Sequence, residues 1–344
     1  MKKSIIILGL LLFQGFSHSF AQNDPSKYQV LNKIKVEGNG GWDYLSMDEN
    51  TSRLYISHGT ITQVLDIYEQ KVVGTIPDTK GVHGIALAKD LGKGFISNGR
   101  DSSVTVFNLK TLRVSGKVKV TGNNPDAILY DPFTHKVFTF NGRSSNSTVI
   151  DAASEKVIGT IPLPGKPEFS VTDGKGKIYV NIEDKSELCM INPVTLKVEQ
   201  TWSIAPGEEP SGLAIDVKNQ RLFSVCGNKL MIILNATNGN VVAKVDIGDR
   251  VDGVGFDPSL KRAYSSNGDG TLTVVQEENE NTFRVIENFP TQKGARTIAV
   301  NPKTHRIYLP TAEFEAAPAP TTDNPRPRPS VKADSFVILE IAPK

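Results

Sequence analysis

The chain has 344 residues, with 39 Lys and Arg against 37 Asp and Glu, so its formal net charge is only +2. This balance gives no electrostatic basis for binding nucleic acid or an anionic membrane surface. By length alone the chain could hold two domains, but a closed ring of repeats accommodates such a length as one unit.

The first 21 residues are typical of a secretory signal peptide. A basic start (Lys2 and Lys3) is followed by an apolar run over 5–13 and a small-x-small cleavage site at 19–21. No later apolar stretch is long enough to span a bilayer. We therefore expect a periplasmic or secreted protein in which residues 22–344 form a single domain.

The next segment, Lys27 to Val36, has a strand-like composition but no partner beside it in sequence. Repeated units follow, and the stretch from Pro125 to Lys166 shows their plan most clearly. It contains four short runs rich in β-branched and aromatic residues, which are separated by turn-forming residues; the runs are 127–130, 137–140, 148–150 and 157–161. Runs of this length and composition predict strands. Four strands in about 42 residues is the size of one propeller blade.

Seven such units share one register. We call their first polar residue the blade-opening position, and it is occupied by Asp43, His83, Asp126, Glu168, Ser211, Asp252 and Arg296. Five residues later, six of the seven units carry a turn-capping side chain, namely Asp48, Asp131, Asp173, Asp216, Asp257 and Asn301. This register predicts an all-β, seven-bladed β-propeller with four-stranded antiparallel blades.

The second predicted strand of each unit carries its own signature. It reads Tyr55-Ile56-Ser57-His58, Phe95-Ile96-Ser97-Asn98, Phe138-Thr139-Phe140-Asn141, Tyr179-Val180-Asn181-Ile182, Phe223-Ser224-Val225-Cys226, Tyr264-Ser265-Ser266-Asn267 and Tyr308-Leu309-Pro310-Thr311. These tetrapeptides resemble the YVTN-type β-propeller repeat family of YncE-like exported proteins, although Ile182, Cys226 and Thr311 depart at the Asn position. The resemblance implies the propeller fold, but this family is defined by architecture more than by chemistry.

The last unit lacks one strand. Its first two strands are predicted over 296–300 and 306–310, and its third over 335–341. We expect the segment over 27–36 to supply the missing outermost strand and so to close the ring, which removes an exposed sheet edge. Between the second and third strands lies a Pro-rich insertion, 312–334, which we interpret either as a solvated loop or as a lid.

In a propeller, the blade-opening residues and the ends of the second strands gather around one mouth of the central channel. The side chains at the blade-opening position differ from blade to blade, although the position within the blade is the same. This variation indicates a functional site added to the repeat. The predicted ligand-binding residues are Asp43, Arg100, Asp126, Asn141, Arg143, Glu183, Ser211, Asp252, Asn267 and Arg296. The alternative is a hydrated channel without chemistry.

From this mouth we predict an exported recognition protein that binds a small polar or anionic ligand, or another exported protein. The alternative is a metal- or His-assisted hydrolase or lyase of the lactonase kind, acting on a sugar acid or lactone, with His83 or His58 as general base and Glu168 or Asp126 as its orienting partner. A divalent metal is a possible cofactor, since carboxylates favour Ca²⁺ or Mg²⁺ and the two histidines a transition metal. No compact metal motif is present. The cysteines, Cys189 and Cys226, are expected to be packed thiols.

Overall fold

The structure is a computed structural model that describes residues 27–38, 40–319, 321, 327 and 329–344. The predicted signal peptide, residues 1–21, lies outside the described residues. Within the described part of the chain, no helix is both long enough and apolar enough to span a membrane.

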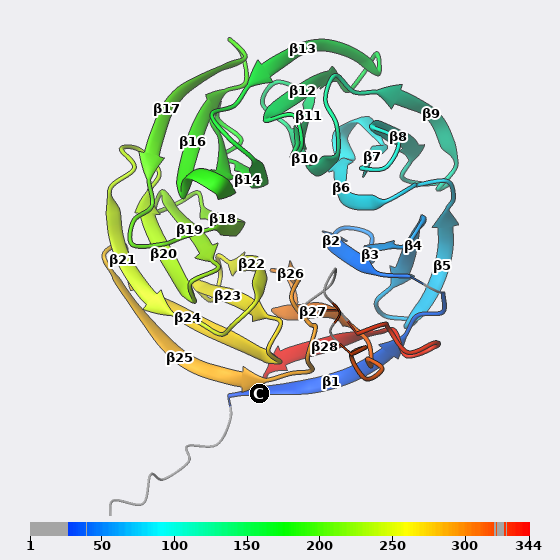
Figure 1. Ribbon diagram of the computed structural model, residues 1–344, viewed down its shortest axis with the longest axis vertical. Helices are drawn as coiled ribbons and strands as arrows, with labels where there is room; N and C mark the ends of the chain where they lie inside the picture. The colour runs from blue at the N-terminus through cyan, green and yellow to red at the C-terminus, as the bar shows by residue number, and fades with distance from the viewer. Residues whose placement is uncertain (1–26, 39, 320, 322–326, 328) are drawn as a thin grey trace, which may run out of the picture.

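The strands form seven four-stranded antiparallel sheets arranged in a ring, so the predicted seven-bladed β-propeller is confirmed (Figure 1). The innermost strands are β2 (Trp42–Asp48), β6 (Val82–Ala88), β10 (Pro125–Asp131), β14 (Pro167–Thr172), β18 (Pro210–Asp216), β22 (Val251–Asp257) and β26 (Ala299–Asn301). The second strands are β3 (Arg53–His58), β7 (Lys93–Asn98), β11 (Lys136–Asn141), β15 (Ile178–Ile182), β19 (Arg221–Cys226), β23 (Arg262–Asn267) and β27 (Arg306–Thr311). The third strands are β4 (Ile61–Asp66), β8 (Ser103–Asn108), β12 (Asn146–Asp151), β16 (Glu187–Asn192), β20 (Leu230–Asn235), β24 (Thr271–Asn279) and β28 (Val337–Pro343). The outermost strands are β5 (Lys71–Ile76), β9 (Val114–Lys119), β13 (Lys156–Pro162), β17 (Lys197–Ser203), β21 (Val241–Asp246), β25 (Thr282–Pro290) and β1 (Tyr28–Lys35), and two short 3₁₀ turns are η1 (Lys89–Leu91) and η2 (Glu183–Lys185).

The hydrophobic core lies between neighbouring blades. In the third blade, β11 and β12 are buried along nearly their whole length because both faces of the sheet are covered, whereas the outer strand β13 alternates between exposed and half-buried residues over most of its length. Phe138 and Phe140 of this blade pack into one cluster with Ile178 and Val180 of the next. The predicted apolar runs therefore build the walls between blades.

The turn-capping residues act as predicted. Asp131 Oδ2 accepts hydrogen bonds from the backbone N–H and the hydroxyl of Thr134, at 3.0 and 2.6 Å. Its other oxygen accepts a bond of 2.7 Å from the Thr172 hydroxyl of the following blade. One carboxylate thus closes its own turn and also joins two blades.

The ring is closed as expected. Strand β1 pairs antiparallel with β28 from Tyr28↔Pro343 to Lys35↔Val337 and forms the outermost strand of the last blade. The Lys344 N–H donates a further bond of 2.9 Å to the Lys27 carbonyl oxygen. The two ends of the described chain are therefore joined in one sheet.

The innermost strand of the last blade is shorter than predicted. The predicted segment 296–300 enters the ladder only at Ala299, which pairs with Tyr308. The residues before it turn toward the first blade instead, where the Thr297 hydroxyl donates a bond of 2.7 Å to the Asp43 carbonyl.

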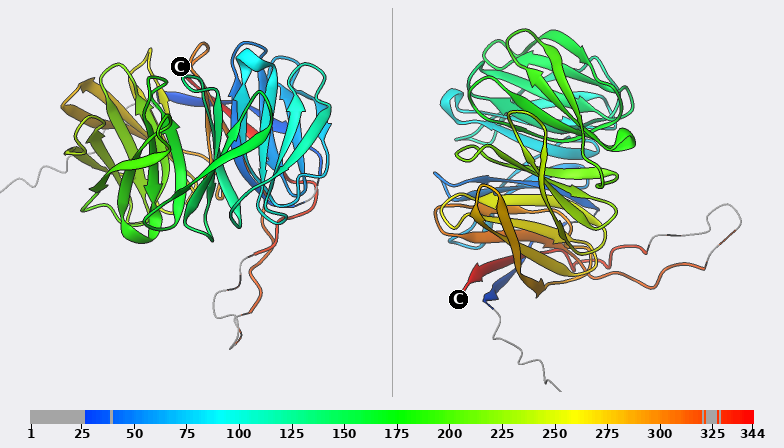
Figure 2. Two further views of the ribbon diagram at one scale, coloured as in Figure 1. Left: turned by 90° about the horizontal axis from the view of Figure 1, so that it is seen from above. Right: turned by 90° about the vertical axis from the view of Figure 1, so that its left-hand side faces the viewer.

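The stem of the Pro-rich insertion packs against the ring. Phe314 contacts the indole of Trp42, with ring centroids 6.1 Å apart, and forms an isolated β-bridge with Val331. Beyond this stem the described residues run away from one face of the ring (Figure 2). They do not lie across the channel as a lid would.

Candidate functional site

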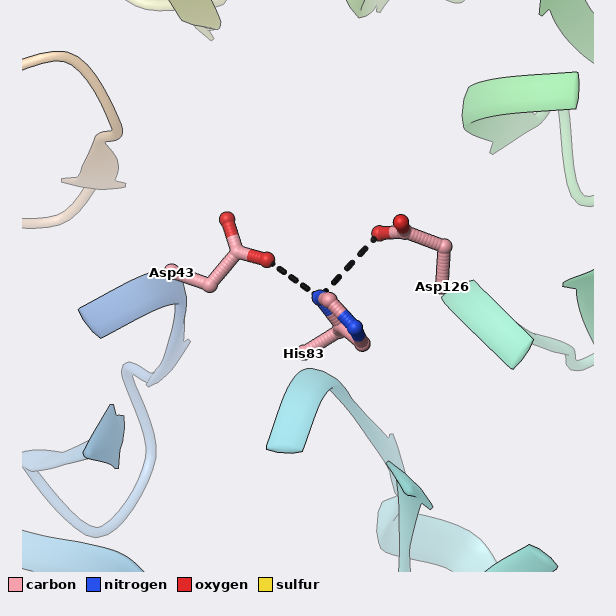
Figure 3. A group of neighbouring side chains, drawn as sticks. All are labelled: Asp43, His83 and Asp126. Atoms are coloured by element: carbon pink, nitrogen blue, oxygen red, sulfur yellow. Dashed lines mark hydrogen bonds and ion pairs between the residues drawn. The ribbon is translucent and has the colours of Figure 1, made fainter. Parts of the chain in front are cut away.

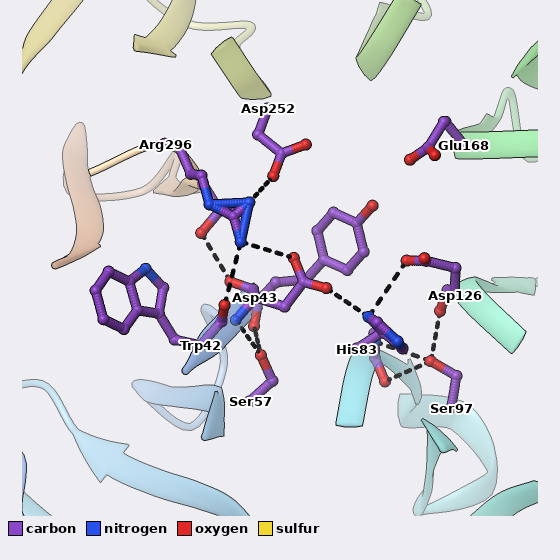
Figure 4. Close-up of polar contacts among 12 residues, drawn as sticks. Trp42, Asp43, Ser57, His83, Ser97, Asp126, Glu168, Asp252 and Arg296 are labelled. Carbon is purple, nitrogen blue, oxygen red and sulfur yellow. Dashed lines mark hydrogen bonds and ion pairs between the residues drawn. The ribbon is translucent and has the colours of Figure 1, made fainter. Parts of the chain in front are cut away.

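A break in strand register turns the blade-opening side chains into the channel. In six blades the innermost strand loses register just after its first pair with the second strand, for example between Pro125 and Ile128. Each break contains the blade-opening residue. Such a β-bulge re-aims a side chain without ending the sheet. Figure 4 shows that Asp126, Glu168 and Asp252 consequently point toward a common centre. Arg296 precedes the short strand β26 of the seventh blade and points toward the same centre without a bulge.

Hydrogen bonds from neighbouring blades fix the backbone at these positions. The Ser97 hydroxyl donates to the Asp126 carbonyl at 2.5 Å, and the Ser266 hydroxyl donates to the Arg296 carbonyl at 2.6 Å. Both serines occupy the third position of the YVTN-like tetrapeptide. A recurrent structural residue thus holds a variable functional residue in place.

The turns after the second strands lie on the same face as the blade openings. In the second blade the Gly99 N–H donates to the Gly81 carbonyl, which directly precedes β6. The same contact recurs in five other blades, for example from Gly142 to Asn124. The geometry assumed from the sequence is therefore correct, and the mouth is bordered by these turns.

Eight charged side chains around the mouth are joined by ion pairs, and we call them the mouth cluster. The cluster consists of Asp43, His83, Asp126, Lys166, Glu168, Glu183, Asp252 and Arg296. His83 lies between two carboxylates, with its Nδ1 2.6 Å from Asp43 Oδ2 and 3.6 Å from Asp126 Oδ1 (Figure 3). The Arg296 guanidinium pairs with Asp252 and lies 4.0 Å from Asp43 (Figure 4).

A second group within the cluster belongs to the fourth blade. The Lys166 ammonium contacts Glu168 Oε1 at 2.8 Å and also pairs with Glu183. The Glu168 side chain is only 12% exposed. Each of the three basic side chains of the mouth cluster therefore has two acidic neighbours within 4.0 Å.

The environment raises the pKa of His83. Burial by itself lowers this pKa, but the hydrogen bond with Asp43 and the charges of Asp126 and Glu168 outweigh it and raise the pKa to about 9. At neutral pH the ring is therefore protonated, with Nδ1 donating to Asp43.

The buried carboxyls also have raised pKa values. Burial, reinforced by neighbouring acids and opposed by nearby basic groups, raises the pKa of Asp126 and of Asp252 to about 6. Burial and the charge of Asp126 raise the pKa of Glu168 to about 8 against the opposing effect of Lys166. The basic groups of the mouth cluster therefore do not fully compensate its acids.

An aromatic pair lies directly beside the mouth cluster. Tyr44 follows Asp43 on β2, Phe169 follows Glu168 on β14, and their ring centroids are 5.1 Å apart. The first and fourth blades lie on opposite sides of the channel (Figure 1). The two rings therefore meet across the channel and form a floor to the mouth.

Three predicted site residues lie inside their blades and do not line the mouth. His58 is 1% exposed, bonds Gln63 through Nδ1 at 2.8 Å and packs on Phe336, so its side chain does not join His83 at the mouth. Asn141 and Asn267 are fully buried. Their amides donate to side-chain oxygens of the third strand of the same blade and hold its second strand in place.

The other predicted residues lie at or around the mouth. Arg100 and Arg143 are exposed on the turns that border it. Ser211 occupies the blade-opening position of the fifth blade, where its hydroxyl donates to the Val251 carbonyl at 3.3 Å. Glu183, a member of the mouth cluster, lies farther from the channel and is joined to the other members through Lys166.

Lys166, Phe169 and Tyr44 are not among the site residues predicted from the sequence. A signal for the aromatic floor exists in the sequence. The residues directly after the blade-opening positions are Tyr44, Gly84, Ala127, Phe169, Gly212, Gly253 and Thr297. Aromatic side chains in two blades of this series and small ones elsewhere indicate that, at this one position of the repeat, two side chains reach far into the channel.

A second concave region lies at the opposite end of the strands. It is a groove of about 460 Å³ lined by turn residues of the first two blades, including Arg53 and Lys89. The Arg53 guanidinium bonds the Leu109 carbonyl, and Lys89 pairs with Asp48 and Glu49. These charges serve contacts between blades, so we place the candidate site at the mouth cluster.

Fold and site together define a β-propeller protein with a charged, floored channel mouth. No family model matches the chain. It is similar to the uncharacterized protein YncE of Salmonella typhimurium and to its namesake in Salmonella typhi, each 21% identical over 332 residues that cover 90% of this chain and 91% of the relative. A solved structure of Kuenenia stuttgartiensis hydrazine synthase superposes with a TM-score of 0.68 at 16% identity, covering 80% of this chain and 94% of that one. The similarity to YncE supports the relationship predicted from the tetrapeptides, the structural likeness concerns the fold alone, and membership of the YVTN repeat family stays a prediction.

Proposed function

We propose that this chain is an exported propeller whose mouth cluster binds a small polar ligand bearing a cationic group. The observation that carries the proposal is the imbalance of the cluster, in which five carboxylates are linked to three basic side chains. Charged side chains that converge from several blades suit a small ligand better than a flat protein surface.

The charge balance supports a cation over the anionic ligand considered from the sequence. An anion would have to displace carboxylates from His83, Lys166 or Arg296, all of which are already paired. A cation would instead stabilise the ionised forms of Asp126, Asp252 and Glu168, whose pKa values burial raises. A bound cation would therefore offset the repulsion among these carboxylates, which is uncompensated in the free protein.

The enzymatic alternative receives less support. The carboxylates around His83 raise its pKa to about 9, which favours the protonated ring at neutral pH and weakens the case for His83 as a general base. His58 is buried within its blade. What remains for catalysis is a metal-assisted reaction, which depends on the inference developed below.

The proposal is tested by thermal denaturation with spermidine, glucosamine and glucarate as cationic and anionic probes. We expect the cationic probes to raise the melting temperature and glucarate to leave it unchanged. Asp252→Asn and Glu168→Gln should abolish the shift, whereas Glu69→Gln, which neutralises an exposed carboxylate away from the mouth, should retain it. Stabilisation by glucarate alone, or an undiminished spermidine shift in the mouth variants, would contradict the proposal. Turnover of a lactone probe would favour the enzymatic alternative.

A further inference from the structure

Three potential metal ligands from successive blades converge at one side of the mouth cluster. Asp43, His83 and Asp126 each offer one ligand atom, and these atoms all lie within 4.8 Å of one another (Figure 3). They come from β2, β6 and β10, the innermost strands of the first three blades. An imidazole nitrogen with two carboxylates is a donor set that divalent metals accept.

The present distances are close to those of a coordinated ion. Ligand atoms about 2.0–2.2 Å from a metal lie roughly 3.0–3.5 Å from one another in tetrahedral or octahedral geometry. His83 Nδ1 is 2.6 Å from the nearer Asp43 oxygen and 3.6 Å from the nearer Asp126 oxygen. A small rotation of the Asp43 carboxylate away from the ring, and of the Asp126 carboxylate toward it, would satisfy this geometry.

The surroundings hold these ligands in place independently of their mutual contacts. The Asp43 N–H donates to the Ser57 hydroxyl at 2.9 Å, and the Asp126 carbonyl accepts from Ser97. Behind the imidazole lies Gly99, where an added Cβ would come within 2.6 Å of His83 Nε2. A glycine at this position is what allows the ring to sit with Nδ1 directed between the two carboxylates.

We propose that Asp43, His83 and Asp126 bind one divalent transition-metal ion such as Zn²⁺ or Mn²⁺. The ion would replace the proton that His83 Nδ1 shares with Asp43 in the free protein, and this proton would be released to solvent. The imidazole nitrogen favours such ions over Ca²⁺ and Mg²⁺, which prefer sites made entirely of oxygen ligands. Three protein ligands leave coordination positions open toward Glu168 and Asp252, where an exogenous ligand would bind. This inference rests on the proposed function, because it names the cation that the mouth cluster takes.

The test is isothermal titration of chelator-treated, desalted protein with ZnCl₂ and MnCl₂, and with CaCl₂ for comparison. We expect one transition-metal ion per chain and at least tenfold weaker binding of Ca²⁺. Asp43→Asn, His83→Ala and Asp126→Asn should each weaken binding more than tenfold, and Gly99→Ala by about tenfold through displacement of the ring. Glu69→Gln should bind like wild type. Melting curves without metal verify that each variant is folded.

Two results would overturn the metal site. One is the absence of saturable binding by the wild-type protein. The other is an equal loss of affinity in Asp252→Asn and Asp126→Asn, because diffuse electrostatic attraction would not distinguish the two carboxylates. Spermidine binding is measured on the same metal-free protein. If spermidine binds and the metals do not, the metal inference is wrong and the proposed function stands; if neither binds, both fail.

Discussion

Tyr44 and Phe169, from blades on opposite sides of the ring, meet across the channel with their ring centroids 5.1 Å apart. The pair lies across the channel directly beside the mouth cluster. Tyr44 is buried, and burial together with the surrounding carboxylates raises the pKa of its phenol well above the ordinary value. The hydroxyl therefore remains neutral at a pH at which an exposed tyrosine would begin to ionise.

The two rings of the floor should be energetically coupled. A double-mutant cycle with Tyr44→Ala and Phe169→Ala is expected to give a coupling free energy of about 0.5–1.5 kcal/mol, measured by urea denaturation. Tyr44→Phe, which retains the ring, should leave most of this coupling intact. Strictly additive effects of the two alanine substitutions would show that the rings do not interact.

The stability of the protein should fall as pH rises from about 5 to about 9. Glu168 has a folded pKa of about 8, and Asp126 and Asp252 of about 6, all raised by burial; the folded state therefore keeps protons that the unfolded chain has lost, and stability falls as each ionises. His83 acts in the same direction. Its contribution is fully present below its ordinary value of 6.5 and is lost as pH passes about 9.

Glu168→Gln isolates one part of this dependence. The variant should melt at a progressively higher temperature than wild type as pH rises from about 5 to about 8, because it cannot ionise. The matched variant Glu69→Gln should follow the wild-type curve at every pH. A difference between Glu168→Gln and wild type that does not change with pH would refute the raised pKa of Glu168.

Removing the closing strand should destabilise the whole ring. Deletion of residues 22–36 removes β1, which buries Tyr28 and Ile34 against the last blade, and should cost about 3 kcal/mol or more in unfolding free energy. Leu31→Ser, at a position of β1 that is 38% exposed, serves as the control and should have little effect. An unchanged melting temperature of the deletion variant would show that β1 contributes nothing to closure.

The Asn residue of the YVTN-like tetrapeptide should contribute to stability and not to ligand binding. Asn141→Ala leaves buried partners without their donor and is expected to cost about 1–3 kcal/mol. Arg143→Ala, two residues away on the exposed turn, should leave stability within about 0.5 kcal/mol of wild type. Chemical denaturation of both variants measures these free energies of unfolding. Equal stabilities of the two variants would contradict a structural role for Asn141.

The two cysteines should react only after unfolding. Both are free and buried, as predicted, and burial raises the pKa of Cys189 to about 11 and that of Cys226 to about 12. A thiol in that state supplies almost no thiolate at neutral pH. Labelling with a maleimide in native buffer should therefore proceed at the rate of unfolding; rapid labelling would show that a blade opens locally.

The fold could be predicted because its signals are local and repeated. Strand lengths, turn-capping residues such as Asp131, and the unpartnered run near Tyr28 each recur or complete a pattern. The site could be predicted only where it coincided with the repeat: the blade-opening position placed Asp43, His83 and Asp126 correctly at the mouth.

Side-chain direction was the missing information. His58 and Asn141 end the second strands close to the mouth, yet their side chains point into the blade. Because successive side chains of a strand point to opposite faces, a shift of one position decides whether a side chain lines the mouth or is buried in the blade. Lys166 lies before the blade opening, outside the repeated register. Its role depends on the contact with Glu183, which comes from a different turn and cannot be read from spacing.

Closure of the ring by β1 and β28 also dictates an order of assembly. Strand β1 is synthesised first and its partner last, so the seventh blade is incomplete until the entire chain has left the ribosome, whereas the other six blades are each contiguous in sequence. During that interval β1 presents unpaired backbone groups and the apolar side chains of Tyr28 and Ile34 to solvent. The nascent chain therefore carries an unpaired strand until β28 is available, and we expect the pairing of these two distant strands to be a slow step of folding.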